Sequence, residues 1–512
     1  MTEHKNLSDV TSPVCRLRFR RRAKIVATIG PASSSLEVMR ELVNAGLDVA
    51  RINMSHGTHE AHAQVIGYLR ALSEEVHRPI AILLDLCGPK IRTGKLKGGK
   101  AVELQAGSLL TITSEEIEGD AKRVSASYPY LTQDLRVGDK ILIDDGLLDF
   151  VVESKTEKEI VCRVIHGGML GQNKGINLPG IPLSIPSITE KDKRDLAFGI
   201  QQGVDYVALS FVRSAKDCEE AQNLIEQLAK STNSHQPPLI AKIEKREALK
   251  ELDDILKIAD GIMVARGDLG VETSTESVPV YQKEMIRKAN QVGKIVITAT
   301  QMLQSMVDNP RPTRAEASDV ANAVLDGTDA VMLSGETAAG AYPIDSIKTM
   351  DRIVCYTEEA VYKQKILQQK DRRVREILAS GGGTGSYGRA LAEAAVFAAD
   401  EVAAPLIAVF TEGGFMAQHV SALRPKQDII AFTHILETHR RLAAVWGIES
   451  FLLQTNGSTA FLELADKMLV EMGLADIEDT IIIVAGTIEG MPLSNMVKLH
   501  RVGDTAKTSE VK

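Results

Sequence analysis

The chain has 512 residues with an ordinary globular composition, 44% hydrophobic and 25% charged, which allows several domains and excludes a disordered chain. The net charge of −8 leaves no basic footprint for nucleic acid, and no apolar run is long enough to span a membrane. Five scattered cysteines without a C-x-x-C pair favour a reducing compartment, so we expect a cytoplasmic protein. Residues 1–22 are polar and end in an arginine-rich run, which we interpret as a solvated lead-in.

Eight short apolar runs rich in valine and isoleucine are predicted to be β-strands, at 24–30, 48–55, 79–86, 205–212, 239–244, 261–265, 294–301 and 330–337. Most are separated by amphipathic segments with apolar residues at helical spacing. Such strand–helix units, eight in number, are typical of a (β/α)₈ TIM barrel, and an open doubly wound sheet is the rival. The count of eight favours the barrel, predicted over 23–86 and 188–355.

The interval between the third and fourth runs is far too long for a βα loop, so it must hold an insertion. Its segments 137–146, 148–153 and 159–165 alternate apolar stretches with turn signals. We predict a small β-barrel domain over 87–187. Because it leaves from a loop at the catalytic face of the barrel, it is expected to act as a lid.

Residues 356–512 are predicted to form a separate C-terminal α/β domain of a regulatory type, with a mostly parallel sheet. Its apolar runs alternate with helical segments and lie at 406–410, 428–432, 451–453 and 480–484. The glycine-rich stretch 380–385 follows no predicted strand. It is therefore interpreted as a flexible connector and not as a phosphate loop.

Polar side chains stand at the predicted carboxyl ends of most barrel strands. A packed core would place valine or isoleucine there, and polar groups are costly unless they serve a ligand. Catalytic residues of barrel enzymes come from the ends of several strands, which favours an active site over a structural ion-pair network. The strand-end residues are Arg51, Asn53, Ser55, Asp85, Lys242, Glu244, Asp268, Thr298, Thr300, Ser334 and Glu336.

The charges among these residues suit phosphoryl transfer. Lys242 and Glu244 are two residues apart on one predicted strand, and side chains at this spacing point to the same face. Together with Asp268, the Glu244 carboxylate could hold Mg²⁺ (or Mn²⁺), which prefers oxygen ligands. Arg51 offers a fork matched to phosphate, and Lys242 could neutralise charge on the moving group. The sequence contains neither a Walker A motif nor a kinase-type glycine-rich loop.

Nine ordered segments carry a family resemblance: 24–33, 51–57, 88–94, 174–179, 241–244, 263–270, 299–303, 311–316 and 332–337. Through them the chain resembles the pyruvate kinase family along nearly its whole length. The resemblance implies transfer of the phosphoryl group of phosphoenolpyruvate to ADP, giving pyruvate and ATP in the last step of glycolysis. It also implies a barrel with an inserted β lid and a C-terminal α/β domain, assembled as a homotetramer.

The resemblance assigns roles to the charged strand-end residues. Glu244 and Asp268 would hold the Mg²⁺ that bridges phosphoenolpyruvate. Lys242 would stabilise the phosphoryl group in flight, and Arg51 would grip it.

The remaining assignments concern the substrate carboxylate, the proton and the nucleotide. The amides of Gly267 and Asp268 would hold the carboxylate together with the Thr300 hydroxyl. Thr300 also lies where the enol is protonated, as one member of a relay. The positions that would contact ADP and its metal are Asn53, Ser55, His56, Arg92 and Lys174.

Two departures from the family pattern change the expected chemistry. In members that need potassium, the residue matching Lys90 is glutamate and the one matching Leu86 is usually threonine. Lys90 is therefore predicted to supply the positive charge, so that K⁺ is not required. The monovalent-ion positions nevertheless persist at Asn53, Ser55, Asp85 and Leu86.

The second departure lies in the loop 411–417 of the C-terminal domain. Relatives regulated by fructose bisphosphate carry a hydroxyl-rich, basic phosphate loop there, whereas this loop has one hydroxyl and the acid Glu412. Fructose bisphosphate is therefore not expected as the effector. Another sugar phosphate, AMP or no effector remain open.

Two other functions stay open at this point. A metal-dependent lyase of the phosphoenolpyruvate/pyruvate group would need no ADP site, and Lys242 and the lid count against it. A non-catalytic metabolite sensor would be expected to have a broken site, and none of the assigned residues is missing.

Overall fold

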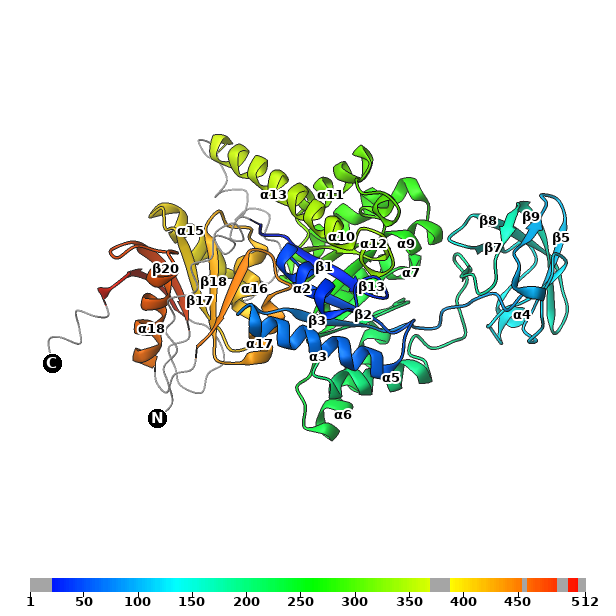
Figure 1. The fold of residues 1–512 in the computed structure, drawn as a ribbon, viewed down its shortest axis with the longest axis horizontal. Helices are drawn as coiled ribbons and strands as arrows, with labels where there is room; N and C mark the ends of the chain where they lie inside the picture. Colours follow the sequence, from blue (N-terminus) through cyan, green and yellow to red (C-terminus); the bar gives the residue numbers. More distant parts are fainter. Residues whose placement is uncertain (1–20, 369–386, 454–457, 486–495, 505–512) are drawn as a thin grey trace.

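The computed structural model describes residues 21–368, 387–453, 458–485 and 496–504. The predicted connector at 380–385 lies outside these ranges. Figure 1 shows three parts in a row, with the barrel in the middle, the inserted domain at one end and the C-terminal domain at the other. No helix among the described residues is long and apolar enough to cross a membrane.

The central part is a closed barrel of parallel strands, which confirms the predicted fold and excludes the open sheet. Every strand residue except Arg51, Asn53 and Lys242 is buried, because the barrel interior and the surrounding helices cover both faces. In order around the barrel the strands are β1 (Lys24–Ile29), β2 (Val49–Asn53), β3 (Ala81–Asp85), β12 (Tyr206–Leu209), β13 (Leu239–Ile243), β14 (Gly261–Ala265), β15 (Ile295–Ala299) and β16 (Ala330–Leu333).

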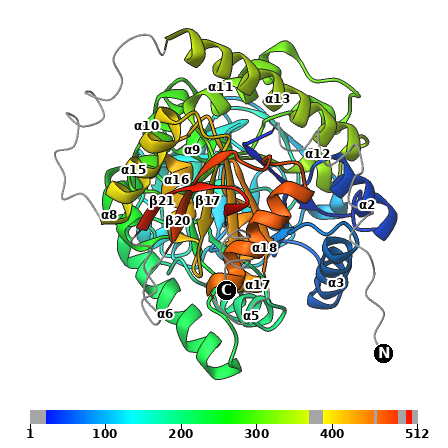
Figure 2. The ribbon, with the colours of Figure 1, turned by 90° about the vertical axis from the view of Figure 1, so that its left-hand side faces the viewer.

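The barrel helices surround these strands, as the end-on view in Figure 2 shows. Their boundaries follow local capping chemistry. The Ser35 hydroxyl accepts the Val38 amide at the start of the first helix, and Gly46 ends that helix with φ of 119°. The helices are α2 (Leu36–Ala45), α3 (His59–Glu75), α5 (Glu190–Gln201), α6 (Ala215–Thr232), α7 (Arg246–Lys250), α8 (Leu252–Ile258), α9 (Arg266–Glu272), α10 (Val278–Gln291), α11 (Arg314–Asp326), α12 (Gly335–Ala338) and α13 (Pro343–Gln368).

The inserted domain is mostly β, with the short helix α4 (Leu131–Asp134) and a 3₁₀ turn at Lys97–Gly99, and it has its own core around Tyr128 and Phe150. The predicted small barrel is realised as an open six-stranded sheet, with β11 and β6 at its edges, and a two-stranded ribbon of β4 and β10. Its strands are β4 (Val102–Leu104), β5 (Leu109–Thr113), β6 (Arg123–Ser125), β7 (Lys140–Ile143), β8 (Leu148–Lys155), β9 (Glu159–His166), β10 (Gly168–Leu170) and β11 (Ile176–Asn177).

The C-terminal domain has a five-stranded sheet in the order β19-β18-β17-β20-β21, parallel except for the edge strand β21. Helices cover the sheet, in agreement with the predicted α/β class. The elements are α15 (Tyr387–Glu401), β17 (Leu406–Phe410), α16 (Phe415–Ala422), β18 (Asp428–Thr433), α17 (Leu436–Leu442), β19 (Ile448–Leu452), α18 (Ser458–Glu471), β20 (Thr480–Ala485) and β21 (Met496–Arg501).

The last two residues of the predicted lead-in join the barrel to this domain. Arg21 is buried and pairs with Asp48 at 2.8 Å. Arg22 donates to the Pro425 carbonyl at 2.6 Å and stacks over the Trp446 ring. The interpretation as a solvated lead-in is therefore wrong for these two arginines, because local polarity alone does not reveal a partner distant in sequence.

Candidate active site

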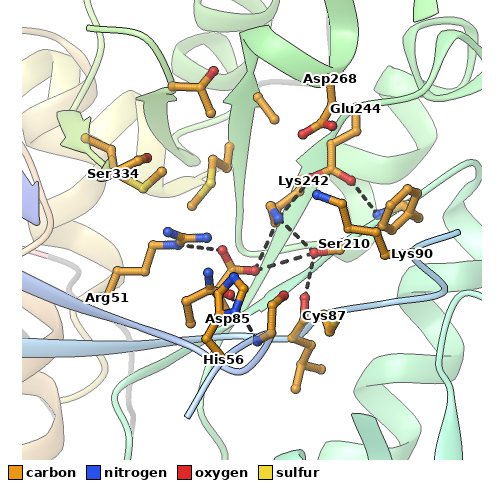
Figure 3. Close-up of a pocket in the computed structure, with 18 of the residues that line it drawn as sticks. Arg51, His56, Asp85, Cys87, Lys90, Ser210, Lys242, Glu244, Asp268 and Ser334 are labelled. Atoms are coloured by element: carbon orange, nitrogen blue, oxygen red, sulfur yellow. Dashed lines mark hydrogen bonds and ion pairs between the residues drawn. The ribbon is translucent and has the colours of Figure 1, made fainter. Parts of the chain in front are cut away.

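The carboxyl ends of the barrel strands converge on a pocket (Figure 3), which Lys90 and Arg92 from the start of the inserted segment also line. This convergence follows from the fold, since parallel strands all end at the same face of the barrel. Thirteen predicted residues line the pocket: Arg51, Asn53, Ser55, His56, Asp85, Leu86, Lys90, Arg92, Lys242, Glu244, Asp268, Thr300 and Ser334.

The Lys242 ammonium lies at the centre of the cluster. Its Nζ is 2.9 Å from Glu244 Oε1 and 3.2 Å from Asp85 Oδ1, and it donates to Ser210 Oγ at 2.8 Å. Burial opposes the charge on this group, but the two carboxylates outweigh it and raise the pKa of Lys242 above its ordinary value. Lys242 therefore stays charged at neutral pH, although only 12% of its side chain is exposed.

Glu244 and Asp268 form the acidic side of the pocket. The Phe211 amide donates to Glu244 Oε2 at 2.9 Å. Asp268 is half-buried and has no hydrogen-bond or ion-pair partner among the described residues. Burial raises the pKa of Glu244, Lys242 lowers it, and the Asp268 charge raises it again. The oxygen atoms of these two neighbouring carboxylates fit a divalent metal such as Mg²⁺.

Arg51 is held on the other side of Lys242 by an internal carboxylate. Its Nε donates to Asp85 Oδ2 at 2.6 Å, and its NH1 donates to Thr28 Oγ1 at 2.9 Å. Burial opposes the ionised form of Asp85, but Lys242 and Arg51 together hold the pKa of this carboxyl below its usual range. The two cations are therefore fixed side by side at the ends of β2 and β13.

Thr300 occupies a strained turn directly after β15, with φ of 67°. Such a conformation costs a β-branched residue energy and persists only where its surroundings hold it. Arg266 donates to the Thr300 carbonyl at 2.7 Å, and the Gly267 amide donates to its hydroxyl at 2.8 Å. Gly267 does not itself line the pocket, but its amide is bonded to Thr300, which does.

The predicted nucleotide contacts divide between the barrel and the lid. Burial, followed by Arg92 and Lys90, keeps the pKa of His56 below its ordinary value, which indicates a positive field at this side of the pocket. Lys174 lies outside the pocket lining, because its Nζ pairs with Asp144 in the lid at 2.9 Å. The Lys174 carbonyl nevertheless accepts the Thr93 amide at 2.8 Å, next to Arg92.

Two of the strand-end residues make structural hydrogen bonds and do not line the pocket. Thr298 is buried against Thr328, with 3.0 Å between the hydroxyls, and does not line the pocket. Glu336 is fully buried and accepts the backbone amides of Ser334 and Leu303 at 2.7 and 3.1 Å. Both residues stabilise loops, so their interpretation as members of the site is wrong.

The pocket also contains residues that the sequence analysis passed over. Ser210 directly follows β12 and donates to the Leu86 carbonyl at 2.6 Å, so it connects the ends of two strands. The strand-end rule that found the other residues would have found Ser210 as well. Cys87 and Phe211 lie in loops where no pattern points to a site.

Comparison with known proteins follows the same division of the chain. Residues 20–347 match the family "Pyruvate kinase, barrel domain", and residues 389–500 match "Pyruvate kinase, alpha/beta domain". Pyruvate kinase of Geobacillus stearothermophilus is 46% identical over 490 residues, which are 95% of this chain and 81% of that protein. The Bacillus licheniformis pyruvate kinase is 44% identical, over 94% of this chain and 81% of that protein. The crystal structure of a pyruvate kinase from Cryptosporidium parvum superimposes with a TM-score of 0.87 at 37% identity, covering 98% of this chain and 100% of that one.

Proposed function

Since the chain belongs to the pyruvate kinase family, we propose that its strand-end cluster transfers the phosphoryl group of phosphoenolpyruvate to ADP. The protein is a phosphotransferase, and the products are pyruvate and ATP. The observation that carries the proposal is the buried, charged Lys242 beside the Glu244 carboxylate, in a pocket that Asp268 also lines. A cation and a pair of acids at neighbouring strand ends are what a migrating phosphoryl group requires.

Lys242 and Arg51 act on the phosphoryl group in this proposal. Both cations are fixed by Asp85 before any substrate arrives, so no free energy is lost to reorganising them during the reaction. A unit charge pair about 4 Å apart interacts by about 4 kcal/mol in partly buried surroundings. The Lys242 ammonium is therefore expected to contribute a large part of the transition-state stabilisation.

Glu244 and Asp268 would hold the divalent metal. When bound, the metal neutralises negative charge on the phosphoryl oxygens and draws them into one orientation. Whether Mg²⁺ or Mn²⁺ serves is decided by availability, because both accept this set of oxygen ligands.

The carboxylate of phosphoenolpyruvate would lie at the amino end of α9, bound by the amides of Gly267 and Asp268. The Gly267 amide donates to the Thr300 hydroxyl in this structure, so the carboxylate would take over that bond. The released Thr300 hydroxyl could then pass a proton towards the enol carbon as one member of a relay.

The nucleotide would lie between the barrel and the lid. Asn53, Ser55 and His56 follow β2 on the barrel side. Arg92 and Lys174 belong to two lid segments joined by backbone hydrogen bonds, so closure of the lid would bring both cations to the ADP phosphates.

A coupled assay separates this proposal from the two alternatives. With purified protein, Mg²⁺ and phosphoenolpyruvate, we expect pyruvate to form only when ADP is added, with one ATP for each pyruvate. A lyase would act without ADP. A sensor would bind phosphoenolpyruvate and turn nothing over.

We further propose that K⁺ is not required. The oxygen atoms that would coordinate a monovalent ion already accept hydrogen bonds or pair with cations in the structure. Asp85 binds Arg51 and Lys242, the side-chain Oδ1 of Asn53 accepts the Ser55 amide at 3.1 Å, and the Leu86 carbonyl accepts the Ser210 hydroxyl. Figure 3 shows the Lys90 side chain directed into the same pocket, where it would supply the positive charge.

Exchange of the Lys90 charge tests this proposal. The wild-type enzyme is expected to keep its rate with tetramethylammonium as the only monovalent cation. Lys90→Glu is expected to lose about tenfold under these conditions and to regain activity with K⁺, since one reversed charge changes the local balance by more than 1 kcal/mol. Lys95→Glu, an exposed lid lysine outside the pocket, is the matched control. A K⁺-dependent wild type would contradict the proposal.

The assembly, the compartment and the regulation are proposed from the family and the C-terminal domain. We propose a homotetramer, acting in the cytoplasm, which analytical ultracentrifugation and cell fractionation can test. The only hydroxyl of the loop 411–417, that of Thr411, already accepts the Gly414 amide at 3.0 Å, so fructose bisphosphate is a poor candidate effector. A panel of phosphorylated metabolites in the coupled assay would identify the effector if one exists.

A further inference from the structure

Ser210 lies where three neighbouring strands of the barrel end. Leu209, the last residue of β12, lies opposite Ala241 of β13, so the residues that follow them, Ser210 and Lys242, leave their strands side by side. On its other side β12 pairs with β3, which ends at Asp85. A short polar side chain at position 210 can therefore reach the polar groups of both neighbouring strands.

The Ser210 hydroxyl makes one hydrogen bond of each kind. It has a single proton, which it donates to the Leu86 carbonyl at 2.6 Å, a much shorter distance than the 3.5 Å to Asp85 Oδ1. Its oxygen is then free to accept the Lys242 ammonium, which donates to it at 2.8 Å (Figure 3). Ser210 is only 2% exposed, so water has little access to either bond.

The partners of Lys242 match the three protons of its ammonium group. Two of them are the carboxylates of Glu244 and Asp85, and the third is the Ser210 hydroxyl. The carboxylates attract the ammonium but also offset its positive charge. The hydroxyl is neutral, so it is the partner that fixes the position of the ammonium and leaves its charge available to a substrate.

The residue after Ser210 supports the other charged group of β13. The Phe211 amide donates to Glu244 Oε2 at 2.9 Å, in a left-handed backbone conformation with φ of 57°. The Lys245 ammonium lies over the Phe211 ring, 5.6 Å from its centroid. Two successive residues at the end of β12 thus hold Lys242 and Glu244, one through a hydroxyl and the other through an amide.

We infer that Ser210 is a positioning residue for phosphoryl transfer, whose hydroxyl, anchored on the Leu86 carbonyl, holds the Lys242 ammonium towards the substrate without neutralising it. The inference rests on the proposed function, because it assigns the ammonium to the phosphoryl group. Without the hydroxyl, the long lysine side chain would be held by its two carboxylates alone. It would settle closer to them, where less of its charge acts on the substrate.

The Ser210→Ala variant tests this role. It is expected to lower kcat about tenfold, the effect of one hydrogen bond to a charged group, and to leave the dissociation constants for Mn²⁺ and phosphoenolpyruvate unchanged. Ser210→Cys should lie between Ser210→Ala and wild type, because a thiol fills the same place and makes weaker hydrogen bonds. Full kcat in Ser210→Ala would overturn the inference.

Ser421→Ala is the matched control for the loss of a buried hydroxyl. In the C-terminal domain, the Ser421 hydroxyl also donates to a backbone carbonyl, that of Trp446, at 2.6 Å, and it also accepts from a cation, Arg424 NH1, at 3.3 Å. A similar decrease in Tm is therefore expected for Ser421→Ala and Ser210→Ala. Only Ser210→Ala should lose kcat, and an equal loss in Ser421→Ala would contradict a specific role of Ser210.

A double-mutant cycle shows whether Ser210 acts through Lys242. In the Lys242→Met background, Ser210→Ala should cause no further loss in the rate of phosphoryl transfer, whereas a general loss of packing would slow both backgrounds by the same factor. The same tenfold loss in both backgrounds would overturn the inference. Wild-type activity tests the proposed function separately. An inactive wild type would refute phosphoryl transfer, and an active wild type with additive losses would refute only the role of Ser210.

Discussion

Replacement of Lys242 by methionine is expected to lower kcat by about a thousandfold. The ammonium lies within 3.2 Å of two carboxylates, and only 12% of its side chain is exposed. Loss of an interaction of about 4 kcal/mol with the phosphoryl group corresponds to about three powers of ten in rate. Methionine keeps the length of the side chain, so the change removes the charge with little effect on packing.

The design of this experiment must separate chemistry from folding. In the variant, Asp85 keeps Arg51 and Glu244 keeps the Phe211 amide, so both carboxylates retain a donor. We expect a small change in Tm at most. Lys216→Met, at a lysine with 80% of its side chain exposed, is the matched control and should keep full activity. The coupled pyruvate assay measures both variants, and a loss of less than tenfold in Lys242→Met would exclude a role in transition-state stabilisation.

Asp268→Asn is expected to have the second largest effect, with activity lost by at least about a hundredfold. Because this carboxylate has no partner in the described part of the chain, the amide should disturb little of the structure. A metal site that loses one of two carboxylates loses most of its affinity. Binding of Mn²⁺, measured as the decrease of the free-ion EPR signal, should therefore weaken in parallel with activity.

A control variant tests whether loss of Mn²⁺ binding is specific to Asp268. Asp254→Asn changes an exposed carboxylate that pairs with Lys257 and should leave Mn²⁺ binding unaltered. If Asp268→Asn bound Mn²⁺ as tightly as the wild type, the metal would have to be held elsewhere. The proposed pairing of Glu244 with Asp268 would then be wrong.

The barrel could be predicted from the sequence because its signals are local. Each strand is a short apolar run, each helix has apolar residues at helical spacing, and the count of eight units selects the closed sheet. The cluster around Lys242 could be predicted for the same reason. Lys242 lies on β13 and Glu244 directly follows it, two residues on, so both point to the same side, and the topology of the barrel brings the other strand ends to them.

Contacts between segments distant in sequence were not predictable in this way. No local pattern shows that Asp85 would bind Arg51 and Lys242 together, or that Glu336 would support backbone amides instead of a ligand. The left-handed conformation of Phe211 is equally hidden, since the residues that its ring contacts, Gly88 and Lys245, are distant in sequence. Arg21 belongs to the same class, because its partner Asp48 is supplied by the folded barrel.

The most direct measurement of the central claim is a single turnover of phosphoenolpyruvate with excess enzyme, Mn²⁺ and ADP, stopped by rapid quenching. The account predicts that Lys242→Met still binds Mn²⁺ and retains most of its affinity for phosphoenolpyruvate, yet transfers the phosphoryl group about a thousandfold more slowly than the wild type. Transfer by the variant at close to the wild-type rate, with substrate and metal bound, would contradict it.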